Sequence, residues 1–160
     1  MTLTLAVLKA RFKYDPLTGV FTYKTGQKRK AGRPAGTLTQ GHLQICIDYK
    51  HYYAHRLAWF YYYGNWPPEQ IDHIDRNGLN NKIDNLRLAS NRENMCNIRK
   101  TNVPNGLPKG VFKLPSGNFA AKISLPSKQL YLGSFTTAQE ASECYKEATI
   151  KYHGQFSPFR

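Results

Sequence analysis

A run of turn-forming residues near the middle of this sequence divides it into two parts. Residues 101–108 hold two asparagines, two prolines and a glycine, a composition typical of a linker. We therefore expect one module over residues 1–100 and a second over residues 109–160. A chain of 160 residues is long enough for two small domains, each of which must bury its own apolar core.

The first module mixes short helices and strands in its sequence pattern. The spacing of apolar residues predicts a short helix over residues 3–13, and alternation predicts strands over 20–24 and 43–47. Residues 55–63 predict a second helix that ends at Gly64 and is followed by two prolines. We expect the aromatic side chains of this helix in the core rather than on a base-stacking surface.

The second module has the pattern of a small sheet followed by one helix. Alternation predicts strands over residues 111–114, 118–125 and 129–133. Thr137 and Glu140 predict a capping box at the start of a helix that stops at Gly154. That helix carries one apolar stripe, formed by Ala138, Ala141, Tyr145, Ala148 and Tyr152. We expect it to cover one sheet face and leave the other open, so the fold class of the whole chain is α+β.

The sequence is strongly basic, with 23 Lys and Arg against 10 Asp and Glu and a formal net charge of +13. Residues 1–70 hold ten basic against three acidic residues and residues 105–160 hold seven against three, whereas residues 71–104 hold six against four. Basic flanks around a near-neutral centre suit a protein that grips a polyanion and cuts it. Nucleic acid is therefore the expected partner.

Other partners and compartments fit the sequence less well. It has neither a long apolar run nor a basic amphipathic helix with a broad apolar face, so we expect no membrane partner. The first residues do not resemble a secretion signal. The three cysteines, Cys46, Cys96 and Cys144, form no Cys-x-x-Cys pair, which argues against a zinc ribbon and a disulfide framework. We expect them as small buried residues in a reducing cytoplasm, and we expect no small-molecule cofactor.

A histidine lies beside a carboxylate at Asp72 and His73, and amide side chains follow at Asn85 and Asn94. Phosphodiester hydrolysis needs a base that activates water and oxygen ligands for a hard divalent metal, and these residue types supply both. An imidazole is the usual general base at neutral pH. The same residues could be ordinary turn chemistry, and it is the surrounding pattern that favours a nuclease.

That surrounding pattern resembles the HNH endonuclease family, in particular its homing-type branch encoded by phages and introns. The matching segments, in order, are Ala54–Trp59, Trp66–His73, Asn80-Asn81 and Asn85–Arg87, followed by an Asn-rich helix start. The resemblance runs from about Gly19 to Asn97. It implies a ββα-metal fold in which Asp72 and His73 end one strand.

The resemblance also implies roles for the candidate residues. His73 would be the general base on the attacking water, while Asp72 and Asn94 would bind the metal. Asn85 would fix the loop and the orientation of the imidazole. Many relatives carry a histidine where this chain has Asn94, so the oxygen ligands imply Mg²⁺ or Mn²⁺ rather than zinc. Asn91 and Asn97 lie on the same helix face and could replace Asn94 as the ligand.

Other polar residues near this pattern are expected to have no role in catalysis or metal binding. Asp75 and Asp84 are expected to cap loops rather than bind metal. His55 is expected to be structural or to contact a phosphate. Three further histidines lack a neighbouring carboxylate and are given no catalytic role, namely His42, His51 and His153.

Residues 109–159 resemble the plant ethylene-response-factor DNA-binding domain, which also occurs in phage endonucleases. The match includes Lys109–Val111, Gly117–Ile123 and Leu132–Phe135. It implies that the open sheet face enters the major groove through six DNA-binding candidates, Lys109, Phe112, Lys122, Ser124, Gln129 and Tyr131. Most of the arginines that give the plant domains their specificity are absent, so the plant target sequence is not expected here.

The favoured interpretation is a metal-dependent endonuclease that hydrolyses phosphodiester bonds in double-stranded DNA. It would be encoded by a phage or mobile element and act in the cytoplasm of a bacterial host. Nicking or double-strand cleavage, and monomer or dimer, stay open. The alternatives are a non-catalytic, sequence-tolerant DNA-binding protein with a decayed nuclease half, and a packaging protein that binds nucleic acid without sequence preference.

Overall fold

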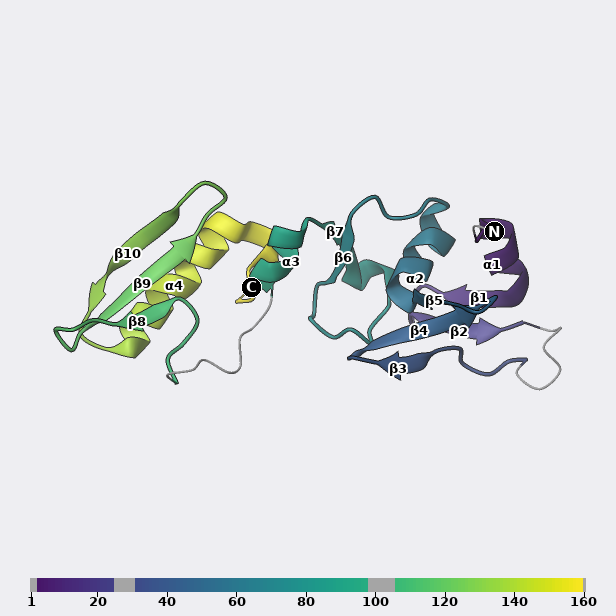
Figure 1. Cartoon of the computed structure of the whole chain (residues 1–160), viewed down its shortest axis with the longest axis horizontal. Helices are drawn as coiled ribbons and strands as arrows, with labels where there is room; N and C mark the ends of the chain where they lie inside the picture. The colour runs from purple at the N-terminus through teal and green to yellow at the C-terminus, as the bar shows by residue number, and fades with distance from the viewer. Residues whose placement is uncertain (1–2, 25–30, 98–105, 160) are drawn as a thin grey trace. The chain divides into compact units, whose positions relative to one another are not determined.

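The computed structural model of the chain describes residues 3–24, 31–97 and 106–159 (Figure 1). It divides into two compact units, Met1–Asn91 and Arg92–Arg160. The division lies ahead of residue 100, where we expected the first module to end. Residues 101–105 of the expected linker lie outside the described residues.

The first unit consists of helices and short antiparallel strands. Its elements are α1 (Leu5–Arg11), β1 (Phe12–Asp15), β2 (Val20–Tyr23), β3 (Thr37–Thr39), β4 (His42–Ile47), β5 (Lys50–Tyr53), α2 (Ala54–Tyr63), β6 (Gln70–His73), a 3₁₀ turn (Ile83–Asn85) and β7 (Leu86–Ala89). β1 pairs with β2, β4 lies between β3 and β5, and β6 pairs with β7. All of these pairs are antiparallel.

Apolar side chains from both helices and from several strands meet in one core. Buried members from successive elements are Leu8, Phe12, Phe21, Ile45, Leu57, Ile71 and Leu86. Removing this apolar surface from water supplies the main favourable term for folding, about 25 cal/mol per Å². β6 contributes Ile71 to this core, and the next two residues of the strand, Asp72 and His73, are buried as well.

The helices of this unit differ in detail from the expectation. α1 ends at Arg11 rather than at residue 13, because Phe12 and Tyr14 are both buried, and only a strand places residues two apart on one face. α2 ends as expected at Gly64, which takes φ +82°. The expectation that all aromatic residues of α2 lie in the core was wrong, since Tyr62 and Tyr63 at its end are 54% and 50% exposed.

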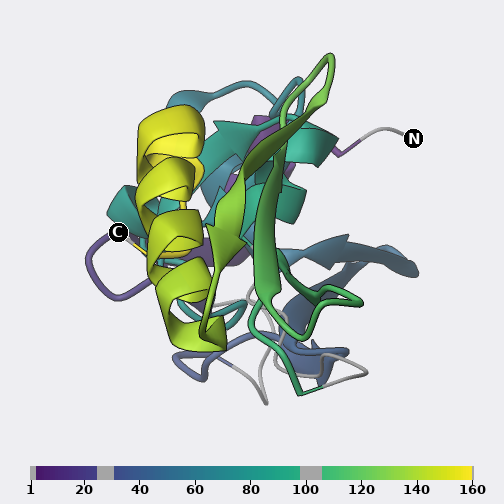
Figure 2. The ribbon, with the colours of Figure 1, turned by 90° about the vertical axis from the view of Figure 1, so that its left-hand side faces the viewer.

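The second unit is a three-stranded sheet with one long helix. Its elements are α3 (Asn91–Asn97), which starts on the last residue of the first unit, β8 (Val111–Lys113), β9 (Phe119–Ser124), β10 (Gln129–Phe135), α4 (Ala138–His153) and a 3₁₀ turn (Gly154–Phe156). The sheet order is β10-β9-β8 and both pairings are antiparallel. Figure 2 shows α4 running along one side of these strands.

α4 covers one sheet face, where Ala121 and Ile123 of β9 pack in a core with Ala141 and Tyr145 of α4. The capping box is present, because the Thr137 side chain accepts from the Glu140 amide and the Glu140 side chain accepts in return. The expected stripe is wrong at its end. Tyr152 is 42% exposed, whereas Thr149 is 1% exposed and bonds Ser157 at 3.0 Å. The 3₁₀ turn after α4 brings Ser157 back to that face.

The expectation of buried cysteines was also wrong. Cys46 is exposed, since it alternates along β4 with Ile45 and Ile47, which face the core. Cys96 and Cys144 are partly exposed, and all three cysteines are free. Among the described residues, no helix is both long and apolar enough to span a bilayer.

Candidate functional site

The β6–β7 pair positions the candidate catalytic residues. Asp72 lies opposite Arg87, and His73 lies opposite Leu86. Asp72 and His73 are 4% and 5% exposed, so both are buried although they are polar. Successive residues of a strand point to opposite faces, and the two side chains accordingly have different partners.

Asp72 forms an ion pair with Arg87, the residue directly across the strand pair. Nε and Nη2 of Arg87 donate to the same Asp72 oxygen, Oδ2, at 2.8 and 2.5 Å. Both side chains are largely shielded from water. A buried carboxylate is costly without a hydrogen-bonded cationic partner, and Arg87 is that partner. The sequence motif contained Arg87, but only the strand register reveals its pairing.

His73 is held by an asparagine that we did not single out as a site residue. Its Nε2 lies 3.2 Å from Oδ1 of Asn81, which is 1% exposed. Asn81 is fixed in turn, because its Nδ2 donates to the Leu79 carbonyl at 3.3 Å and its own carbonyl accepts from the Tyr14 hydroxyl at 2.7 Å. Burial lowers the pKa of His73 and the Asn81 contact opposes this only in part, so the imidazole is neutral at pH 7.

Asn85 organises the loop between the two strands. Its Oδ1 accepts from the Asp75 amide at 3.0 Å, and its Nδ2 donates to Asp75 Oδ1 and to the Asn80 carbonyl at 2.9 and 2.7 Å. Asp75 also accepts from the Asn77 amide and the Asn80 side chain. Burial raises the pKa of Asp75, but these hydrogen bonds outweigh it and the net shift is downward. Asn85 thus acts on the loop, whereas Asn81 contacts the imidazole.

A turn from the start of the chain supports this loop. The Ile83 amide donates to the Pro16 carbonyl at 3.1 Å. Gly19, with φ +74°, approaches so closely that a Cβ there would lie 2.4 Å from the backbone carbon of Asn81. No side chain fits at that distance, so glycine is required both for its conformation and for the close approach.

Two further histidines lie beside His73. The ring centroids of His42 and His55 are 5.6 and 5.1 Å from that of His73, and one ring nitrogen of each of the three lies within 4.8 Å of the others. Burial lowers the pKa of His55 to about 3, with smaller effects from the other two imidazoles. Sequence reasoning missed this cluster. His55 stands in the matched segment Ala54–Trp59, but no spacing rule connects His42 of β4 to β6.

The second predicted metal ligand, Asn94, lies in a different unit from Asp72. Asn94 is in the middle of α3 and belongs to the second unit, so its role beside Asp72 stays a prediction. Of the two alternatives on this helix, Asn91 is exposed and is the last residue of the first unit, whereas Asn97 is 3% exposed within the second.

The predicted DNA-binding residues lie on the sheet of the second unit and in the segment before it. Phe112 and Tyr131 are 50% and 53% exposed, and Lys122 lies with its Nζ 5.8 Å from the centre of the Phe112 ring. Ser124 and Gln129 are exposed as well. Lys109 is only partly exposed, and its Nζ donates to the Cys96 carbonyl at 3.3 Å.

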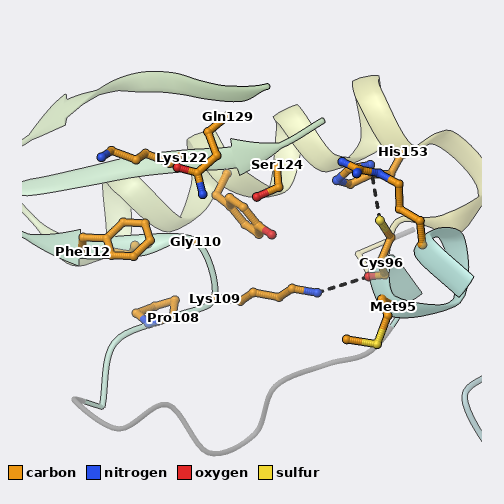
Figure 3. A pocket seen from close by; sticks show the side chains of 13 residues that line it. Met95, Cys96, Pro108, Lys109, Gly110, Phe112, Lys122, Ser124, Gln129 and His153 are labelled. Atoms are coloured by element: carbon orange, nitrogen blue, oxygen red, sulfur yellow. Dashed lines mark hydrogen bonds between the residues drawn. The ribbon is translucent and has the colours of Figure 1, made fainter. Parts of the chain in front are cut away.

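A cavity of about 440 Å³ lies next to these residues (Figure 3). Lys122, Ser124 and Gln129 line it together with Cys96 and His153, whose Sγ and Nδ1 are 3.7 Å apart. Cationic, polar and aromatic side chains here match the groups that bind phosphates and bases. The arrangement could bind nucleic acid.

Comparison with known proteins identifies the first of these two regions. A family model described as HNH endonuclease matches residues 52–96, which include all four predicted residues from Asp72 to Asn94. A protein of Acanthamoeba polyphaga mimivirus, named uncharacterized HNH endonuclease L560, is 32% identical to this chain over 87 residues. The match covers 54% of this chain and 44% of that protein. Protein 3.8 of Escherichia phage T7 is 34% identical over 92 residues, covering 56% of this chain and 74% of that protein.

These matches cover part of the chain and part of each relative. The chain spans less than half of the mimivirus protein, and no solved structure matches it. HNH nucleases generally use a divalent metal. The match includes His55, the β6–β7 pair and most of α3, and it excludes the sheet of the second unit. With a phage relative matched over most of its length and the family model centred on β6 and β7, the chain belongs to the HNH endonuclease family.

Proposed function

We propose that this protein is a metal-dependent endonuclease that hydrolyses phosphodiester bonds in double-stranded DNA, with His73 as the base that activates water. The supporting observation is a buried, neutral imidazole held by Asn81 inside the segment that matches the HNH family. A neutral histidine fixed by a hydrogen bond on one ring nitrogen can take a proton on the other.

The partners of Asn81 indicate which nitrogen acts. Because Nδ2 of Asn81 donates to the Leu79 carbonyl, Oδ1 faces the imidazole and can only accept a hydrogen bond. Nε2 of His73 therefore carries the proton and Nδ1 is the basic nitrogen. In the proposed reaction, Nδ1 takes one proton from the attacking water as its oxygen bonds to phosphorus. The bond from phosphorus to one sugar oxygen breaks, and that leaving oxygen takes a proton from solvent water.

The metal ligands are proposed to be Asp72 and Asn94. A carboxylate and an amide oxygen fit a hard cation such as Mg²⁺ or Mn²⁺, which keeps several waters and is completed by substrate phosphate. When bound, the metal neutralises charge that develops on the phosphate. Arg87 fixes the position of the Asp72 carboxylate, and Asn85 is hydrogen-bonded to the loop after His73.

DNA binding is proposed for the second unit, through the open face opposite α4. A three-stranded antiparallel sheet with one covering helix is the arrangement expected of an ethylene-response-factor-like domain. The proposed contacts are Lys109, Phe112, Lys122, Ser124, Gln129 and Tyr131. A homing-type nuclease of a phage or mobile element, acting in the cytoplasm of a bacterial host, would use such a module to choose its site.

One observation favours the rival of a non-catalytic DNA-binding protein. Arg87 already neutralises Asp72, and a metal would have to bind a carboxylate that has a cationic partner. A cleavage assay separates the two possibilities, because the rival binds DNA without cutting it.

The decisive experiment incubates supercoiled plasmid with Mg²⁺ and follows nicked and linear products. His73→Ala should lower the cleavage rate by about 10²–10⁴-fold, the usual effect of losing a positioned base. His51→Ala is the matched control, because His51 is an exposed histidine on β5. DNA binding should be unchanged in both variants. Cleavage by His73→Ala within a few-fold of the parent protein would exclude His73 as the base.

A further inference from the structure

Three histidines of the first unit form a cluster that the proposed hydrolysis uses only in part. His42 comes from β4, His55 from α2 and His73 from β6. One ring nitrogen of each lies within 4.8 Å of the other two. His73 has its proposed role as a base, but that role gives no reason for two more imidazoles at its side.

The two additional imidazoles, His42 and His55, each bury a ring nitrogen that needs a hydrogen-bond partner or a ligand. Within the described part of the chain, Nδ1 of His42 and Nδ1 of His55 are buried and have no hydrogen-bond partner. A buried polar atom without a partner is costly, and native proteins normally satisfy it with water, an ion or another side chain. The cluster therefore lacks a component that a bound cation could supply.

We propose that His42, His55 and His73 form a binding site for a transition-metal ion of the Zn²⁺ class. Imidazole nitrogen suits zinc, copper, nickel and iron, whereas Mg²⁺ requires oxygen, so this site and the proposed Asp72 site select different ions. Three histidine ligands leave a fourth position for water or phosphate. A Zn–N distance of about 2.0–2.1 Å sets neighbouring nitrogens roughly 3.4 Å apart in a tetrahedron, so the cluster tightens on binding.

Occupancy of this site has a consequence that rests on the proposed function. An imidazole that donates its lone pair to zinc cannot accept a proton from water. Zinc bound to the cluster therefore competes with the use of His73 as a base. We expect Zn²⁺ to inhibit cleavage that Mg²⁺ supports, and a zinc chelator to restore it.

The binding test uses the full chain, titrated with Co²⁺ under reducing conditions and then with Zn²⁺ as competitor. We expect one Co²⁺ per chain, with visible bands of a tetrahedral complex and without the charge-transfer bands of thiolate ligands. His42→Gln should weaken binding by at least about 10-fold, the lower end of what disturbing a metal site costs. His51→Gln, the matched control, should bind as the parent does. No binding, thiolate bands, or equal affinity in His42→Gln would overturn the proposal.

An NMR measurement on the parent protein tests the same site without requiring that a variant fold correctly. The chain has five histidines, and Zn²⁺ should shift the imidazole ¹⁵N resonances of the three in the cluster but not those of His51 and His153. Shifts confined to the latter two would also overturn the site.

Cleavage assays then separate this proposal from the function on which its consequence rests. For each protein, the Zn²⁺ concentration that halves its own zinc-free cleavage rate is measured. This concentration should be at least about 10-fold lower for the parent than for His42→Gln. Zinc binding that depends on His42 in a protein that never cuts DNA would keep the site and reject the nuclease. Cleavage with Mg²⁺ and no zinc binding would do the reverse.

Discussion

The two units of this protein hold their functional candidates in opposite ways. In the first unit Asp72, His73 and Asn81 are buried, and each has a hydrogen-bonded partner from another part of the chain. In the second unit Phe112 and Tyr131 are half exposed on an open sheet face. Chemistry at phosphorus needs groups fixed to a fraction of an ångström, whereas a binding face can adjust its exposed side chains to the DNA.

This contrast predicts different consequences of substitution in the two regions. Changes in the first unit should lower the cleavage rate and, where a buried charge is involved, also stability. Changes on the open face of the second should lower DNA affinity while the maximal rate stays the same. Loss of catalytic rate from a change on the open face, or loss of DNA affinity alone from a change at the buried site, would contradict this division.

Asp72→Asn should have the largest effect, because it leaves the shielded Arg87 without its anion. Breaking such a pair from one side costs about 3–5 kcal/mol of unfolding free energy, measurable by urea denaturation. Cleavage should also be lost. Asn94→Asp, which adds an anionic oxygen instead of removing one, should be less damaging.

A double variant separates stability from chemistry at this position. Asp72→Asn with Arg87→Gln removes both charges, so stability should recover in part while cleavage stays lost. Full activity of Asp72→Asn at low Mg²⁺, or cleavage in excess chelator, would show that the metal ligand is misplaced.

Asn81→Ala should lower the cleavage rate by about 10–100-fold, the usual cost of removing a group that orients a functional side chain. Asn81→Asp keeps the acceptor but places a carboxylate against the imidazole, which raises the pKa of His73. Its rate profile should therefore shift to higher pH, whereas a merely structural role would leave the profile in place. Asn77→Ala, in the same loop, is the control.

Lys122→Ala should weaken DNA binding without changing the cleavage rate at saturating DNA. If Lys122 contacts one phosphate, the slope of log K against log salt should become shallower by about 0.9. Lys151→Ala is the matched control, because Lys151 lies on α4, which covers the opposite sheet face. Equal losses in the two variants would indicate non-specific attraction rather than a binding face.

The smallest effect is expected at the capping box of α4. Hydrogen bonds from Thr136 and Thr137 lower the pKa of Glu140. The carboxylate therefore stabilises the fold fully above its ordinary pKa, and this contribution is lost as pH falls through the lowered value. Thermal unfolding at pH 7 and pH 3 should show a smaller decrease for Glu140→Gln than for the parent. An identical decrease would show that the cap contributes nothing.

Local sequence signals predicted much of the secondary structure. Gly64 ended α2 as expected, and the box of Thr137 and Glu140 started α4, because these signals depend on residues a few positions apart. The errors occurred where tertiary packing decided. α1 ends two residues early because a strand buries Phe12 and Tyr14, and Thr149 is buried in place of Tyr152 because Ser157 packs against α4.

The site was less predictable than the fold. A family resemblance located His73, but the pairing of Asp72 with Arg87 follows from strand register, and the contact with Asn81 follows from the path of a loop. His42 lies in the cluster although β4 and β6 belong to different sheets, because both strands pack against the core of the first unit. Contacts between segments far apart in sequence produce no periodic pattern from which they could be predicted.

Gly19 connects two segments of the first unit that lie about sixty residues apart in sequence. Its backbone lies so close to Asn81 that the loop can take this path only where the turn of Asp15–Gly19 leaves room for it. That turn is stabilised by hydrogen bonds between near neighbours in sequence, whereas its contact with Asn81 is long-range. Through Asn81, the placement of the His73 imidazole therefore depends on a turn that is remote in sequence and has no side chain in the site.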